Sequence, residues 1–367
     1  MPGLITHKKI LEDAISLISS PKRKKTYIDK SIISLMSSPE YRRAALFGSI
    51  GPNIFDYLPS RDKNNYVGHP VSYFFHNGNS EKLISSFTSI LFSYKDKQTH
   101  WASMQRAYLF GFISHIIADT IIHPFSFYWS GFPKAVTKKD VIYYRHQNLL
   151  YYYNMDNYFL YKDDNKDSLF FNSDEMIPIE KARIFKRISP AIRCYILKAI
   201  DDSQPDMFNK LLFKKTKVKD KNNDYYLSLL SYLDLFPDLF FLTQKLKKTP
   251  NEKIHKVLDK LASNTMTYSD FFVRYPHHRN INDHVLNLHM EKWQFPAGSP
   301  ELKYESIKKL INTVLEKTLV TWRDFEESLF NETEIDFSSY FNFNALTGTE
   351  SSYHDMKLSE PIKLMNF

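Results

Sequence analysis

The stretch "FISHIIADTIIHPF", residues 112–125, decides the fold prediction, because it sets three polar side chains into an otherwise apolar run. His115, Asp119 and His123 follow one another at intervals of four residues. Since an α-helix has 3.6 residues per turn, positions i, i+4 and i+8 lie along one stripe of its surface. Residues 101–123 therefore predict a helix that is apolar on every side except for a line of two imidazoles and a carboxylate.

Apolar residues recur with a period near 3.6 along most of the chain, whereas the alternating pattern of strands is nearly absent. Helices are expected at 4–18, 39–47, 80–95, 101–123, 139–161, 180–200, 206–215, 226–247, 251–264 and 305–329. Pro124 disfavours the helical conformation for the residue before it, so the central helix is expected to end or kink there. The prediction is an all-α multi-helix bundle formed by residues 1–335, followed by a weakly patterned C-terminal tail at 336–367.

The composition narrows the class of protein. Of the 367 residues 43% are hydrophobic and 16% aromatic, and 49 basic against 41 acidic residues give a net charge of +8, a weak bias toward phosphate-bearing partners. The single cysteine excludes an intramolecular disulfide and a cysteine-based zinc site.

The N-terminus lacks the pattern of a secretory signal, which favours a cytoplasmic protein with at most peripheral membrane contact. Residues 107–129 could span a membrane by length, but Asp119 would cost about 2.5–3.5 kcal/mol there.

The aligned polar residues suggest a metal site. Histidine nitrogen and carboxylate oxygen are ordinary zinc ligands, and an uncompensated buried carboxylate is costly. The alternative is a buried hydrogen-bonded network in a plain helical bundle. In that case, replacing His115 or Asp119 by alanine would change stability without changing metal content. Further ligands would have to come from the other histidines, of which the candidates are His7, His69, His76 and His146.

Four segments resemble the zinc-dependent phospholipase C family: "MPGLITHKK" (1–9), "GSIGPNIFDY" (48–57), "GFISHIIADTIIHP" (111–124) and "HVLNLHMEKWQFP" (284–296). The resemblance covers roughly residues 1–325, and His-x-x-x-Asp-x-x-x-His-Pro is its most specific element. It implies an all-α bundle with a trinuclear zinc centre. It also implies hydrolysis of the phosphodiester of phospholipids to diacylglycerol and a phosphorylated head group. Zinc-dependent single-strand nucleases share this architecture.

The resemblance implies site residues one by one. It assigns metal ligation to His7, His115, Asp119, His123 and His146. His76 is preferred over His69 for a further ligand, because a polar turn follows His76 as in the family. Asp119 and Asp56 are the residues expected to orient the attacking water.

The sequence departs from the family at two carboxylates. Asn53 stands where the family has an aspartate, and it could serve only as a weak metal ligand. Leu150 stands where the family commonly has glutamate four residues after the histidine here numbered His146, and Asn154 follows where aspartate is often found. Asp56 or Asp156 could substitute after a small shift.

Fewer anionic ligands leave more repulsion between metal ions, so one to three zinc ions are expected. Two functions remain open: an active phosphodiester hydrolase acting on phospholipids, and a non-catalytic metal-binding relative with a degenerate site. A nuclease is less favoured, because lysine-rich loops alone do not make a basic groove with stacking platforms. The aromatic residues 143–153 could contact acyl chains or a membrane surface, or they could simply pack in the core.

Overall fold

The computed structural model describes residues 3–22, 24–57, 70–132, 138–162, 175–181, 186–213, 229–248, 283–298 and 301–357, and its mainly helical content confirms the all-α prediction. The helices are α1 (Leu4–Ser19), α2 (Tyr27–Ser37), α3 (Pro39–Gly48), α4 (Pro70–His76), α5 (Ser80–Phe92), α6 (His100–Ser130), α7 (Lys138–Lys162), α8 (Pro190–Ser203), α9 (Pro205–Phe213), α10 (Leu229–Lys248), α12 (Ile307–Asn331) and α13 (Ser338–Phe341). Short 3-10 helices are η1 (Gly51–Tyr57), η5 (Asp283–Leu286) and η6 (Tyr353–Asp355). Two antiparallel hairpins pair β1 (Ile179–Lys181) with β2 (Lys186–Ile188), and β3 (Trp293–Gln294) with β4 (Leu302–Lys303).

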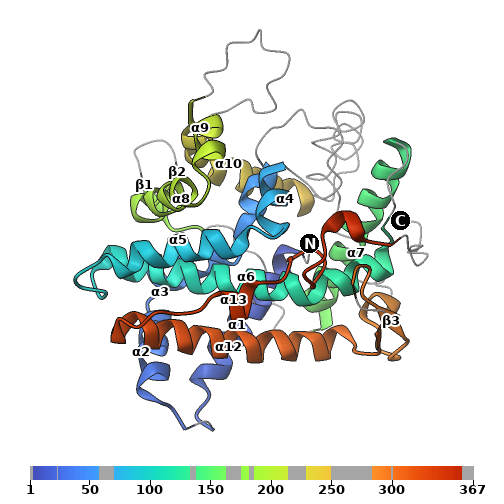
Figure 1. The fold of residues 1–367 in the computed structure, drawn as a ribbon, viewed down its shortest axis with the longest axis horizontal. Coiled ribbons are helices and arrows are strands. Elements are labelled where there is room, and N and C mark those ends of the chain that lie inside the picture. Colours follow the sequence, from blue (N-terminus) through green and yellow to red (C-terminus); the bar gives the residue numbers. More distant parts are fainter. Residues whose placement is uncertain are drawn as a thin grey trace.

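Helix α6 runs through the middle of the bundle, and α12 runs alongside it (Figure 1). Helix α6 packs against α1, α3, α5, α7, α8 and α12. A helix that is apolar all round must be enclosed, and α6 is buried along nearly its whole length. Within the described part of the chain, α6 is the one helix long and apolar enough to cross a membrane, but 89% of its most apolar window is buried inside the protein. The apolar surface of α6 is therefore covered by the surrounding core residues.

Two glycines bring α3 and α6 into backbone contact. A Cβ atom on Gly48 would lie 2.0 Å from the carbonyl oxygen of Tyr108, and one on Gly111 would lie 1.9 Å from that of Ala45. No other residue type fits this crossing. The close approach carries the turn that follows α3, beginning with Ser49, against the polar stripe of α6.

Of the two outcomes expected at His123, an end or a kink of the central helix, the end is wrong, because α6 continues through Pro124 to Ser130. Proline removes the hydrogen bond to the carbonyl oxygen of Thr120, four residues earlier. Packing outweighs this loss: Phe125 is fully buried, and its ring centroid lies 5.3 Å from that of Trp293. Tertiary contacts thus keep the helix going past a residue that usually stops one.

Two further segments differ from the sequence prediction. Strands β1 and β2 pair antiparallel, Ile179 opposite Ile188, and the helix expected from 180 begins only at Pro190, whose fixed φ suits a first helical position. Helix α2 was not predicted, although Thr26 and Asp29 form a capping box at its start. The helix expected at 251–264 lies outside the described residues.

The C-terminal segment is packed against the bundle rather than loose. Phe337 and Phe341 join the main core, whereas Leu346, Tyr353 and Met356 form a smaller cluster with other aromatic residues, among them Phe127 and Phe132. These anchors are irregularly spaced, so they produce no helical period in the sequence. Residues 337–356 of the weakly patterned tail thus contact the bundle, and the domain boundary at residue 336 stays a prediction.

Candidate metal centre

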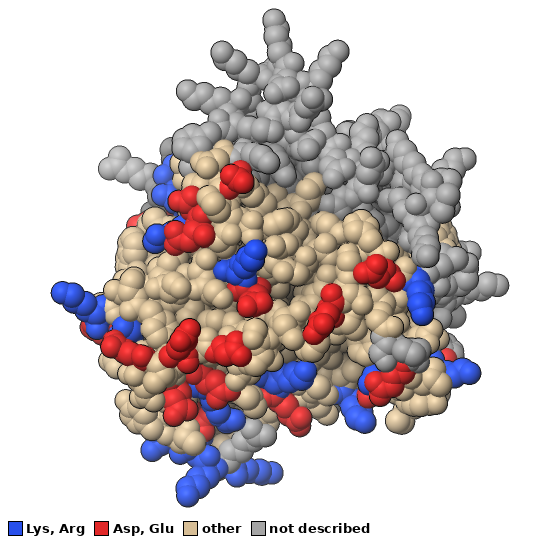
Figure 2. All heavy atoms as spheres, in the orientation of Figure 1, with Lys and Arg blue, Asp and Glu red and all other residues tan. Residues whose placement is uncertain are grey.

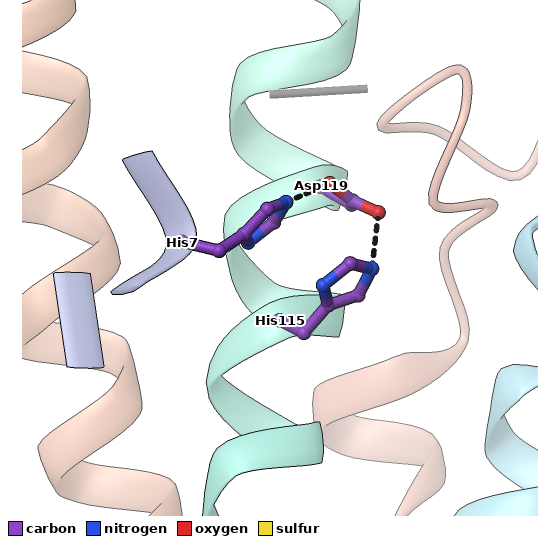
Figure 3. Close-up of side chains that lie close together, drawn as sticks. All are labelled: His7, His115 and Asp119. Atoms are coloured by element: carbon purple, nitrogen blue, oxygen red, sulfur yellow. Dashed lines mark ion pairs between the residues drawn. The ribbon is translucent and has the colours of Figure 1, made fainter. Parts of the chain in front are cut away.

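Four imidazoles surround the carboxylate of Asp119 in the centre of the bundle. Nε2 of His76 and Nε2 of His115 each lie 2.9 Å from Oδ2 of Asp119, whereas Nε2 of His7 and Nε2 of His123 lie 3.2 and 3.3 Å from Oδ1. His7 comes from α1, His76 from the end of α4, and the other three residues from α6. All five side chains are at most 2% exposed. Figure 3 shows His7 and His115 reaching the carboxylate from two sides, with their rings stacked 4.0 Å apart.

Backbone carbonyl groups fix the orientation of three of these rings. Nδ1 of His76, His115 and His123 lies 2.7, 2.9 and 2.6 Å from the carbonyl oxygens of Ser72, Ser49 and Ala345, respectively. A carbonyl oxygen can only accept, so each Nδ1 must carry the hydrogen. In its neutral form, each ring then presents the lone pair of Nε2 toward Asp119, which is how metal-binding histidines are usually held.

The turn after α3 holds His115 on two sides. Its Ser49 carbonyl accepts from Nδ1, and Gly51, with a φ of +59°, lies flat against the ring. A Cβ atom on Gly51 would lie 2.3 Å from Cδ2 of His115, so this position requires glycine for conformation and for space. The "GSIG" segment therefore orients a candidate ligand.

The donor set fits a metal ion. Several atoms have no hydrogen-bond partner among the described residues: both nitrogens of His7, Nε2 of His123 and both oxygens of Asp119. The Nε2–carboxylate contacts have the distance of hydrogen bonds but not their alignment. Ligand atoms of a tetrahedral zinc lie about 3.3 Å apart, close to the observed 2.9–3.3 Å. Lone pairs that converge on a buried carboxylate need a cation between them.

Burial disfavours the protonated form of two of the rings, those of His7 and His123. Burial, and then the neighbouring His115, lower the pKa of His7 to about 4 in spite of the attraction of Asp119. Burial likewise holds the pKa of His123 well below its usual value. For Asp119, burial opposes ionisation, but the electrostatic attraction between its carboxylate and the rings of His115, His123 and His7, in their protonated forms, outweighs burial and holds its pKa well below the usual range. Neutral imidazoles around a carboxylate are the protonation states that zinc requires.

Asp156 holds the start of α1 and thereby places His7. Its carboxylate accepts from the amide groups of Ile5 (3.3 Å) and Thr6 (2.9 Å) and from the Thr6 hydroxyl (2.7 Å). A Cβ atom on Gly3 would lie 2.0 Å from Oδ2 of Asp156, which explains a glycine directly before the helix. Asp156, on α7, therefore caps a helix far away in the sequence.

The other predicted site residues are Asn53, Asp56, His146 and His69. Asn53 lies in η1, and its buried Oδ1 has no hydrogen-bond partner among the described residues. Asp56 lies on the same 3-10 helix, is partly buried and contributes to raising the pKa of Tyr232 after burial and Tyr57. His146 belongs to α7, but its side chain is outside the described residues, as is the whole of His69.

Leu150 and Asn154, which stand on α7 where the family has carboxylates, make packing and hydrogen-bond contacts. Leu150 packs against the main core, and its carbonyl accepts from Nδ2 of Asn154 at 2.9 Å. Asp156 is used in the cap of α1.

Two features near the centre were not expected from the sequence. The hydroxyl of Tyr152 is buried without a hydrogen-bond partner among the described residues, and burial together with Asp119 raises its pKa well above the usual value. Because Tyr151, Tyr152 and Tyr153 are all buried, this part of the aromatic run packs inside the protein. The second feature is the contact of Ala345 with His123, which no sequence pattern near residue 345 indicates.

Comparison with known proteins agrees with this geometry. Residues 6–199, more than half of the chain, match the family described as zinc-dependent phospholipase C. The chain belongs to this family, as the sequence motifs indicate. No curated protein and no solved structure matches the chain. All five residues of the cluster lie inside the matched range, whereas Ala345 lies beyond it.

Proposed function

We propose that this protein is a zinc-dependent hydrolase that cleaves the phosphodiester bond of phospholipids. The observation that carries the proposal is the convergence of four imidazole Nε2 atoms on one buried carboxylate, in a chain of the phospholipase C family. When bound, zinc supplies a Lewis acid that makes water nucleophilic at neutral pH and offsets the charge that builds on the phosphate oxygens.

The chain's own residues would divide the remaining work. His7, His76, His115 and His123 would hold the metal, with His146 as a further proposed ligand and Asn53 as a weak one. Asp119 would neutralise part of the metal charge and orient the attacking water. Asp56, three residues after Asn53 on η1, is the second carboxylate proposed to orient that water.

A non-catalytic zinc protein is the second candidate, and one specific observation favours it. Leu150 packs in the core and Asp156 caps α1, so two positions that could restore anionic ligands are otherwise engaged. With Asn53 neutral as well, fewer metal ions would be held than the three that the family resemblance implies. Such a centre would stabilise the bundle without hydrolysing a substrate.

A nuclease is supported less well. Binding a nucleic-acid backbone without sequence preference requires a groove of concentrated positive charge lined by aromatic side chains. Figure 2 shows acidic and basic side chains mixed over the described part of the face in view, including several acidic groups near its middle. That face offers no reason to prefer nucleic acid over phospholipid.

The deciding experiment combines metal content with hydrolysis. Zinc per chain should be measured by elemental analysis on protein purified without a metal-affinity tag, and hydrolysis with short-chain phosphatidylcholine and single-stranded DNA. His115→Ala and Asp119→Ala should lose bound zinc and phosphatidylcholine hydrolysis together. His100→Ala is the matched control, because His100 is 52% exposed and contacts only Glu40 among the ion pairs of the described residues. Bound zinc without hydrolysis of either substrate would refute the enzyme and favour the structural role.

A further inference from the structure

The C-terminal segment reaches back to the candidate metal centre at one residue, Ala345. Its carbonyl oxygen accepts from Nδ1 of His123 at 2.6 Å, and its amide donates to the carbonyl oxygen of His76 at 3.0 Å. Ala345 thus touches two ligand-bearing segments at once. In Figure 1 the C-terminal segment (red) passes α6 on its way from α13.

The turn that presents Ala345 is itself well ordered by hydrogen bonds. The amide of Asn344 donates to the carbonyl of Thr349, and the amide of Gly348 donates back to the carbonyl of Asn344, both at 2.8 Å. Oδ1 of Asn344 accepts from the Leu346 amide at 2.9 Å, and its Nδ2 donates to Oδ1 of Asn77 at 2.6 Å. We call residues 344–349 the closing turn. It is joined to the segment directly after His76 by the Asn344–Asn77 contact.

The closing turn docks where α6 lacks a hydrogen bond. Pro124 has no amide hydrogen to donate to the carbonyl of Thr120, and Gly348 packs directly over this pair. A Cβ atom on Gly348 would lie 2.5 Å from Cγ of Pro124 and 2.6 Å from the Thr120 oxygen. Gly348 also has a φ of +68°, so both space and conformation require glycine. The docking point is next to His123, the residue that the turn contacts.

We infer that the closing turn is a built-in part of the metal centre: through the carbonyl of Ala345 it positions His123 for zinc binding. Without that acceptor, Nδ1 of His123 would lose the partner that keeps its hydrogen, and the lone pair of Nε2 would no longer be directed at Asp119. His76 and His115 receive this support from residues within the family-matched range, Ser72 and Ser49. His123 receives it from a segment outside that range, so residues 344–349 complete a site whose ligands all come from the first part of the chain.

The test compares zinc affinity in two full-length glycine variants. Gly348→Ala forces the closing turn off Thr120 and Pro124. Gly78→Ala introduces alanine at a similar φ of +83°, but with nothing within 4 Å of the new Cβ, so it is the matched control for backbone strain. Zinc affinity, measured by chelator competition, should fall about 10- to 100-fold in Gly348→Ala. In Gly78→Ala it should stay within about twofold of wild type.

A spectroscopic measurement separates positioning from a general loss of stability. In metal-free protein labelled with ¹⁵N-histidine, His123 should show hydrogen on Nδ1 alone, its resonance being assigned by loss in His123→Gln. In Gly348→Ala the hydrogen should be shared between Nδ1 and Nε2. If Gly348→Ala fails to fold, Asn344→Ala, which loses only the side-chain contacts of the turn, is judged by the same two criteria.

Equal zinc affinity in Gly348→Ala and Gly78→Ala, or an unchanged His123 resonance in Gly348→Ala, would overturn the inference. The inference rests on the proposed zinc chemistry, but its readouts do not involve hydrolysis. A wild-type protein that binds zinc and cleaves no phosphodiester would refute the proposed function alone. An active wild type with an unaffected Gly348→Ala variant would refute the role of the closing turn alone.

Discussion

Replacing Asp156 by asparagine tests whether this carboxylate is a helix cap or a metal ligand. Asp156 is fully buried and accepts three hydrogen bonds from residues 5 and 6 at the start of α1. Hydrogen bonds to a charged acceptor contribute about 1.5–3 kcal/mol each. Asparagine can keep the two contacts of Oδ1 with Thr6. It must, however, turn its amino group toward the Ile5 amide, where a donor meets a donor.

We expect Asp156→Asn to lower the free energy of unfolding by about 2 kcal/mol. One charged contact is lost outright and two become neutral, and the relief of a buried charge offsets part of this loss. The free energy of unfolding of the metal-free protein, measured with urea in the presence of a chelator, should therefore fall by about 2 kcal/mol. Zinc affinity should also weaken about tenfold, because His7 lies directly after the capped residues.

The control is Asp13→Asn on the same helix. Asp13 lies 3.0 Å from Lys9 in a partly exposed pair four residues apart, and such pairs contribute less than about 1 kcal/mol. A different pattern would refute the reasoning. If Asp156→Asn left metal-free stability within about 0.5 kcal/mol of wild type but strongly reduced bound zinc, Asp156 would be a ligand and not a cap.

Three further outcomes are expected. Burial alone would raise the pKa of Asp29, but the Thr26 amide, Arg323 and the Thr26 hydroxyl together outweigh it and hold this pKa below its usual value. The ionised Asp29 therefore stabilises the folded protein above about pH 4, and this stabilisation is lost as the pH falls through the lowered folded-state pKa. In denaturant titrations, Asp29→Asn should lower the free energy of unfolding by about 1 kcal/mol at pH 7 and by progressively less toward pH 3. Gly111→Ala should cost about 3 kcal/mol or more in the same assay, because the new Cβ would meet the backbone oxygen of Ala45 at 1.9 Å. Asn53→Asp should raise the amount of zinc bound per chain in elemental analysis, and no gain would place residue 53 outside the metal centre.

Much of the central architecture can be predicted from local sequence. The four-residue spacing of His115, Asp119 and His123 puts them on one stripe of a helix, and the apolar residues between them require that helix to be enclosed. The family resemblance favours His76 over His69; His76 lies 2.9 Å from Asp119, but His69 lies outside the described residues, so this preference stays a prediction. The helix and its polar stripe can be predicted because helical periodicity is a property of short segments.

Other features depend on contacts between distant segments. Pro124 predicts a helix end, yet α6 continues because the residues around it are packed from several sides. Asp156 looks like a spare carboxylate in the sequence, but it is used in capping α1, 150 residues away from Thr6. The sequence predicts a helix from residue 180, but β1 and β2 pair antiparallel before Pro190.

By itself, the sequence determined the helical class, the polar stripe in the central helix and the membership of the phospholipase C family. Only the tertiary structure decided which carbonyl groups orient the histidines and that Ala345, within residues 344–349, contacts His123. The physical reason is that a side chain's period along one helix is a local property, whereas a hydrogen-bond partner such as Ala345 is selected by packing. The contact of Ala345 with His123 joins positions 222 residues apart, and nothing local to either position specifies the other.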